Sequence, residues 1–199
     1  MVQFMTKFDL PLVATTPDTW APCVLNDFPR FLQDHAACER KAAALAMSLV
    51  AKYTDREALV EPMVALAREE LEHFQQVYRL MVRKRVPLAT ADQKDGYINA
   101  ILKGLRHGRE ERLLDRLIIS GLVEARGFER FALLADSLLD DGLKQFYRQL
   151  SDREAGHYKI FVNCARHYFP EEQVNEALER ISKIEAQAML SAPIRPTLH

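Results

Sequence analysis

Two short motifs of the same form divide this sequence into similar halves. Each motif is a glutamate followed three residues later by a histidine, and in each half another glutamate stands 31 or 30 positions before the motif. The six residues are Glu39, Glu70, His73, Glu124, Glu154 and His157. On an α-helix, residues three apart lie on the same face. The repeat therefore predicts two groups of three metal-ligating side chains.

Apolar residues recur at helical spacing through most of the chain, which predicts an all-α protein. We expect a single domain over residues 1–199, consisting of an extended N-terminal arm, two helical hairpins joined by a crossover, and an extra helix. The predicted ranges are 1–25 for the arm, 26–84 for the first hairpin, 85–108 for the crossover with a short helix near 91–102, 109–168 for the second hairpin and 171–189 for the extra helix. The fourth helix is expected to run unbroken over 143–168, and the tail after 189 to be loosely ordered. A four-helix bundle with one long crossover is the ferritin-like arrangement.

The positions of the hairpin turns predict that the six residues lie at one level. A turn near Thr54 is about 15 residues from both Glu39 and Glu70, and a turn near Leu139 is 15 residues from both Glu124 and Glu154. At equal rise per residue, the two glutamates of each hairpin then face each other at the same height.

The surroundings of these glutamates favour a metal centre. Each lies in a stripe of apolar or small residues, and four buried carboxylates are too costly unless cations neutralise them. Four glutamates and two histidines form the ligand set of di-iron and di-manganese carboxylate bundles, so we predict two iron ions, with manganese as the alternative. Ser120, Gly121 and Gly127 either leave room there for O₂ and an apolar group or allow close helix packing. His35, one turn before Glu39, is either a core-edge residue or a group supporting the site.

Charge and cysteine content limit the partners and the compartment. The net charge is −1, but residues 83–116 contain nine Lys/Arg and five Asp/Glu, which indicates either a solvated connection or a polyanion-binding strip. Three cysteines without a CxxC pair argue against disulfides. No signal peptide and no apolar run of about 20 residues is evident, so we expect a soluble cytoplasmic protein that does not bind a membrane.

Three stretches around these residues resemble the tRNA hydroxylases that act on 2-methylthio-N6-isopentenyladenosine, which are non-haem di-iron enzymes of the ferritin-like superfamily. The stretches are LAREELEHFQQVYRLMVRKRVPL (66–88), KGLRHGREERLLDRLIISGLVEARGFER (103–130) and SDREAGHY (151–158). The resemblance implies an O₂-dependent monooxygenase that hydroxylates the isopentenyl group, with tRNA and an external electron donor as partners. It also implies that Glu70 and Glu154 bridge the irons, with Glu39 and His73 on one iron and Glu124 and His157 on the other.

If the resemblance holds, the basic stretch 83–116 contacts tRNA phosphates. The candidate residues are Arg83, Lys84, Arg85, Lys103, Arg106 and Arg109.

Three alternatives remain open. Another di-iron oxidase or hydroxylase with a small apolar substrate, such as a quinone precursor, would share all six ligands. An iron-binding or ferroxidase bundle would need no organic substrate. A bare helical bundle would bind no metal at all.

Overall fold

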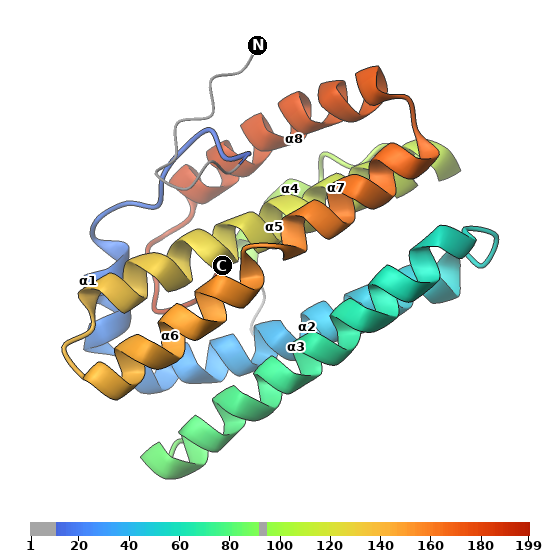
Figure 1. The fold of residues 1–199 in the computed structure, drawn as a ribbon. Coiled ribbons are helices and arrows are strands. Elements are labelled where there is room, and N and C mark those ends of the chain that lie inside the picture. Colours follow the sequence, from blue (N-terminus) through green and yellow to red (C-terminus); the bar gives the residue numbers. More distant parts are fainter. Residues whose placement is uncertain (1–10, 92–94) are drawn as a thin grey trace. The chain divides into compact units, whose positions relative to one another are not determined.

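The computed structural model describes residues 11–91 and 95–199, which form helices and no strand (Figure 1). The prediction of an all-α fold is therefore confirmed. The chain divides into two compact units. Of the described residues, the hairpin unit comprises 23–91 and 195–198, and the main unit comprises 11–22, 95–194 and 199. The prediction that they form a single domain stays a prediction.

The hairpin unit is built from two long antiparallel helices, α2 (Phe28–Lys52) and α3 (Glu57–Lys84). The carboxylate of Asp27 caps α2 by accepting a hydrogen bond from the backbone N–H of Arg30 at 3.3 Å. At the other end, Arg85 ends α3 in a left-handed conformation with φ 57°, and its N–H bonds back to the last turn. Both helices lie within the predicted range of 26–84.

The main unit packs its other helices around α5 (Arg109–Ser137). Its neighbours are α6 (Asp141–Glu154), α7 (His157–Tyr168) and α8 (Glu171–Ser191), and α8 in turn packs against α4 (Gly96–Leu102). The prediction of one continuous helix over 143–168 is wrong, because residues 155–156 interrupt it (Figure 1). Glycine is a poor helix former, and the apolar spacing that continues on both sides of Gly156 concealed the break.

Three segments outside the long helices differ from the prediction. Helix α1 (Trp20–Asn26) lies inside the predicted extended arm, so that prediction is wrong for this segment; the arm's first ten residues lie outside the described residues. The short crossover helix begins at Gly96 rather than near 91, and residues 92–94 are not described. In the tail, Leu198 is buried and its N–H donates to Asp34 Oδ2 at 2.7 Å. The expectation of a loose tail is therefore wrong.

A buried ionic network that the sequence did not predict joins α5 and α8 of the main unit. Arg126 is fully buried and donates to both carboxylate oxygens of Glu185, at 2.8 and 3.0 Å, and to Glu129. Glu129 also accepts from the hydroxyl of Thr16 at 2.6 Å, and Tyr97 donates to Glu185 at 2.8 Å. Burial raises the pKa of Tyr97 well above its usual value, so this phenol stays protonated. The network anchors the N-terminal segment and α4 to the helices beneath them.

Within the described residues, no helix combines the length and hydropathy that a bilayer crossing requires. The three cysteines are not cross-linked, as predicted.

Candidate metal centre

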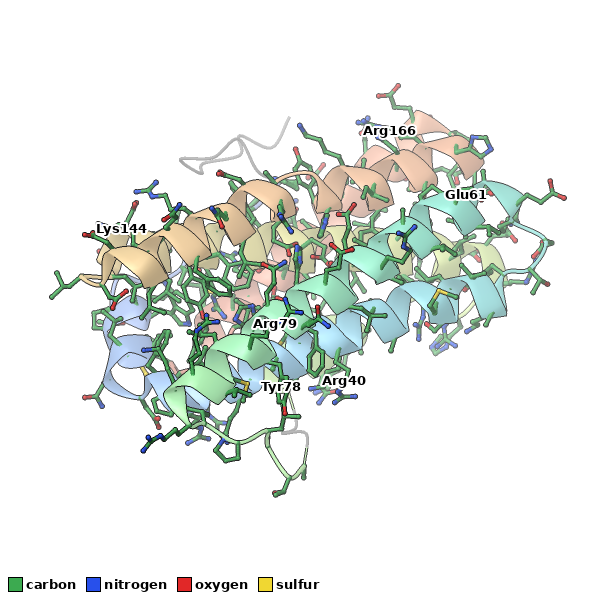
Figure 2. All side chains as sticks on the ribbon, turned by 60° about the horizontal axis from the view of Figure 1, so that its bottom comes forward. Arg40, Glu61, Tyr78, Arg79, Lys144 and Arg166 are labelled. Carbon is green, nitrogen blue, oxygen red and sulfur yellow. The ribbon has the colours of Figure 1, made fainter. Side chains whose placement is uncertain are left out.

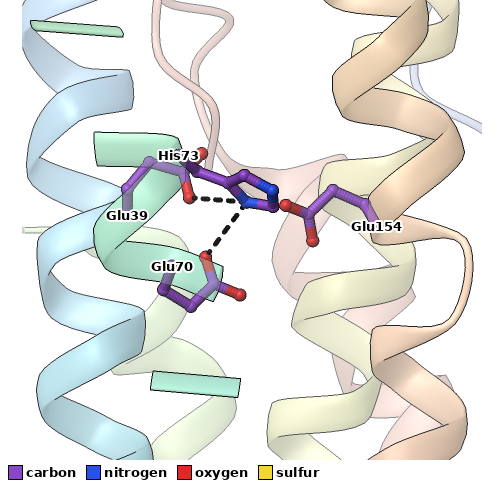
Figure 3. A group of neighbouring side chains, drawn as sticks. All are labelled: Glu39, Glu70, His73 and Glu154. Carbon is purple, nitrogen blue, oxygen red and sulfur yellow. Dashed lines mark ion pairs between the residues drawn. The ribbon is translucent and has the colours of Figure 1, made fainter. Parts of the chain in front are cut away.

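The hairpin unit brings Glu39, Glu70 and His73 together from two uninterrupted helices (Figure 3). Glu39 comes from α2, and the other two lie one turn apart on α3. His73 Nδ1 is 3.8 Å from Glu39 Oε2 and 3.7 Å from Glu70 Oε2. All three side chains are at most 4% exposed. This is the first of the two predicted groups.

These separations suit ligands of a common cation. Two donor atoms each about 2.1 Å from one ion lie roughly 3 to 4 Å apart. The distances from His73 Nδ1 to the two carboxylates fall in this range and are longer than a good hydrogen bond. One donor atom from each of the three residues lies within 4.8 Å of the others. Carboxylates and an imidazole at such separations can hold a first-row transition metal ion.

The main unit assembles Glu124, Glu154 and His157 in a different way. Glu124 lies on α5, Glu154 is the last residue of α6, and His157 is the first residue of α7. His157 Nδ1 is 2.6 Å from Glu154 Oε2 and 3.7 Å from Glu124 Oε2. The expectation that Glu154 and His157 share one helix is wrong, but the break leaves them close enough to serve as a second ligand group.

His35 supports the first group. It is fully buried, and its Nε2 lies 2.7 Å from Glu39 Oε1. Burial, together with the nearby His73, lowers the pKa of His35 to about 3. A neutral ring facing a carboxylate oxygen must carry its proton on Nε2 and donate it. Of the two interpretations of His35 given above, the structure favours a residue that supports the site, because this hydrogen bond orients the carboxylate of Glu39.

Of the small residues near Glu124, Gly121 allows close packing of two helices. A Cβ added to Gly121 would lie 3.2 Å from the backbone oxygen of Tyr158 and 3.4 Å from Phe161 Cβ. Helices α5 and α7 thus approach closely there. Gly127 has more room, since the nearest atom to its added Cβ is 4.0 Å away.

The six cations predicted to contact tRNA lie in different environments. Arg83, Lys84 and Arg85 are exposed at the end of α3, and Lys103 is exposed after α4. Arg106 differs, because its guanidinium binds the buried carboxylate of Asp115 at 2.8 Å. These bonds raise the pKa of Arg106 and give it a structural role. Arg109 is 3.7 Å from Glu110.

An all-α fold that carries two groups of two glutamates and a histidine is typical of carboxylate metalloproteins of the ferritin-like type. Over residues 3–199 the chain matches the family described as tRNA-(MS[2]IO[6]A)-hydroxylase (MiaE). The protein belongs to this family, and the predicted resemblance is confirmed.

Individual relatives agree with this assignment. The tRNA 2-(methylsulfanyl)-N(6)-isopentenyladenosine(37) hydroxylase of Pseudomonas putida is 36% identical over 96% of this chain and 92% of its own. The Salmonella typhimurium protein of the same name is 29% identical over 88% of this chain and 82% of its own. A solved structure, "Protein 43 with aldehyde deformylating oxygenase activity" from Synechococcus, has a TM-score of 0.88 and 36% identity, covering 93% of this chain and 92% of that one.

Proposed function

We propose that this protein is an O₂-dependent monooxygenase that hydroxylates the isopentenyl group of 2-methylthio-N6-isopentenyladenosine in tRNA. The observation that carries the proposal is the family match over nearly the whole chain together with the two groups of candidate ligands. A tRNA-modifying enzyme is expected in the cytoplasm, which stays a prediction.

The residues proposed to hold two iron ions are the six predicted ligands. Glu39, Glu70 and His73 of the hairpin unit and Glu124, Glu154 and His157 of the main unit would hold these ions; manganese is the alternative metal. When bound, the metal would supply the chemistry that reduces O₂ and directs one oxygen atom to a C–H bond. An external donor must provide the electrons.

The protein's own residues would hold the metal ions, orient the ligands and contact the tRNA. The carboxylates would neutralise the cations, and the burial of Glu39, Glu70 and Glu154 keeps water away from them. His73 and His157 can bind a cation through Nδ1 only if that nitrogen is deprotonated, so each ring would carry its proton on Nε2. His35 would hold Glu39 in its binding orientation through the 2.7 Å hydrogen bond. The exposed cations at the end of α3, with Lys103 and Arg109, are candidate contacts to tRNA phosphates.

The test is chemical. The iron-loaded, reduced protein is incubated with O₂ and tRNA carrying the prenylated, methylthiolated adenosine, and the nucleosides are then digested and weighed. A mass gain of one oxygen atom on that nucleoside, absent without O₂, is expected. An unchanged nucleoside mass with fully loaded protein would reject the proposal.

One observation favours a second candidate, an oxygenase acting on a small apolar substrate. The Synechococcus protein named for aldehyde deformylating oxygenase activity is as similar to this chain, at 36% identity, as the Pseudomonas hydroxylase. The same loaded protein is therefore tested with an aliphatic aldehyde. Deformylated product without any hydroxylated nucleoside would favour this second candidate. Metal binding far above two ions per chain, with neither product, would favour iron storage.

A further inference from the structure

The charges on α3 are segregated along its length. Its first part, up to Glu72, contains five glutamates and one arginine, whereas residues 73–85 contain four Lys/Arg and no carboxylate. Cations in the last turn of a helix are common, because they complement the helix dipole, and this accounts for Arg83 and Lys84. It does not account for Arg79, which lies more than a turn earlier. The basic half of α3 therefore needs another explanation.

Two arginines and two apolar side chains share the solvent-facing side of this half. Tyr78, Arg79, Val82 and Arg83 are spaced i, i+1, i+4 and i+5, so they form one continuous surface. Tyr78 is 42% exposed and Val82 is 58% exposed, and both arginines are exposed as well. Figure 2 shows Tyr78 and Arg79 projecting from α3. Among the described residues, neither Arg79 nor Arg83 forms an ion pair.

Tyr78 has the geometry of a stacking platform. Its ring stacks on that of Phe74, one turn earlier, with centroids 6.3 Å apart and an interplanar angle of 12°. Phe74 is partly buried, so it supports the tyrosine ring from one side. Proteins that bind single-stranded nucleic acid place bases on such aromatic rings, next to cations that contact the backbone.

The charges of Arg79 and Arg83 favour nucleic acid over a second copy of the chain as the partner of this surface. In a two-fold symmetric dimer this surface would face itself, bringing Arg79 and Arg83 against their own counterparts. Like charges opposed across an interface are unfavourable. A polyanion with exposed bases complements both the arginines and the aromatic ring.

We propose that the surface formed by Tyr78, Arg79, Val82 and Arg83 docks the tRNA, with Tyr78 stacking on an unpaired base and the two arginines binding phosphates. This inference rests on the proposed function and assigns a binding site to its substrate. It adds Tyr78 and Arg79 to the cations expected from the sequence, and it assigns no such role to Arg106.

The test measures binding of fluorescently labelled tRNA by anisotropy at several salt concentrations. Tyr78→Ala should weaken binding about 5- to 100-fold, as expected for the loss of one stacked base. Tyr78→Phe keeps the ring and should restore most of the affinity. The double variant Arg79→Ala/Arg83→Ala should weaken binding about tenfold and reduce the slope of log K against log salt by about 1.5 to 2.

A matched control removes two positive charges elsewhere in the hairpin unit. Lys52→Ala/Arg68→Ala changes the net charge equally and should retain the wild-type salt slope. Metal content and circular dichroism, expected to be unchanged, show that each variant is folded.

The outcomes separate this inference from the proposed function. Wild-type protein that neither binds nor hydroxylates tRNA overturns both. If the wild-type protein is active and the Tyr78 and arginine variants bind tRNA as tightly as it does, only the docking surface is overturned. The docking surface is also overturned if Lys52→Ala/Arg68→Ala loses as much tRNA affinity as Arg79→Ala/Arg83→Ala. A dimer that Tyr78→Ala dissociates, with tRNA binding unaffected, would assign the surface to a second copy instead.

Discussion

The two candidate ligand groups each consist of two glutamates and a histidine but are built with different backbone geometry. In the hairpin unit, Glu39, Glu70 and His73 project from uninterrupted helices, and a neutral histidine orients one of the carboxylates. In the main unit, Glu154 and His157 stand on either side of a helix break. The first group is held by regular helical geometry, and the second by the packing of α6 and α7 against α5. A repeat in sequence therefore does not ensure a repeat in structure.

The largest expected effect comes from deleting a candidate ligand in the group that projects from uninterrupted helices. Glu70→Ala should reduce hydroxylation at least about a thousandfold, which is about 4 kcal/mol, because it removes one of the two buried carboxylates of the first group. The measurement is the metal-to-protein ratio together with the yield of oxidised nucleoside. The control is Glu72→Ala, an exposed glutamate on the same helix, which should retain both. Full metal content in Glu70→Ala would remove this residue from the ligand set.

The next largest effect concerns the ionic network of the main unit. Arg126→Ala leaves Glu185 and Glu129 buried without their cation and should lower the free energy of unfolding by about 3 to 5 kcal/mol. Arg148→Ala breaks an exposed pair with Asp136 and should cost at most about 1 kcal/mol. Urea denaturation measures both. Equal effects would show that the buried network does not stabilise the unit more than a surface pair does.

A smaller effect tests whether His35 supports only the first group. His35→Ala should weaken metal affinity about 10- to 100-fold, because Glu39 loses its 2.7 Å hydrogen bond. Metal titration followed by spectroscopy should show one ion bound more weakly and the other almost unchanged. Equal weakening of both ions would show that the two groups bind metal as one unit.

The smallest effects come from two glycines of the main unit and should have opposite signs. An alanine at Gly156 meets no atom within 4 Å and should raise the free energy of unfolding by about 0.5 to 1 kcal/mol. An alanine at Gly121 meets the backbone of Tyr158 and should lower it by about 1 to 3 kcal/mol. Thermal unfolding distinguishes the two. Destabilisation by Gly156→Ala would show that the helix break has a conformation that alanine cannot adopt.

Sequence reasoning was most successful where a single helix determines the answer. The spacing of apolar residues located α2, α3, α5 and α8 within a few residues, because a periodic core-facing stripe is a local property of the chain. The same reasoning failed at Gly156, since the apolar period continues across the break. It also missed the Arg126 network, because arginines and glutamates distant in sequence show no local sign of being buried together.

The sequence by itself determined that the chain is helical, and it identified two repeated sets of candidate metal ligands. Both follow from local spacing, since residues three apart on a helix share a face whatever surrounds them. Only the tertiary structure decided how each set is held, because contacts between helices set the distances from His73 to Glu39 and from His157 to Glu124. It also decided which cations are committed to the fold, because Asp115 binds Arg106 while Arg79 and Arg83 remain at the surface.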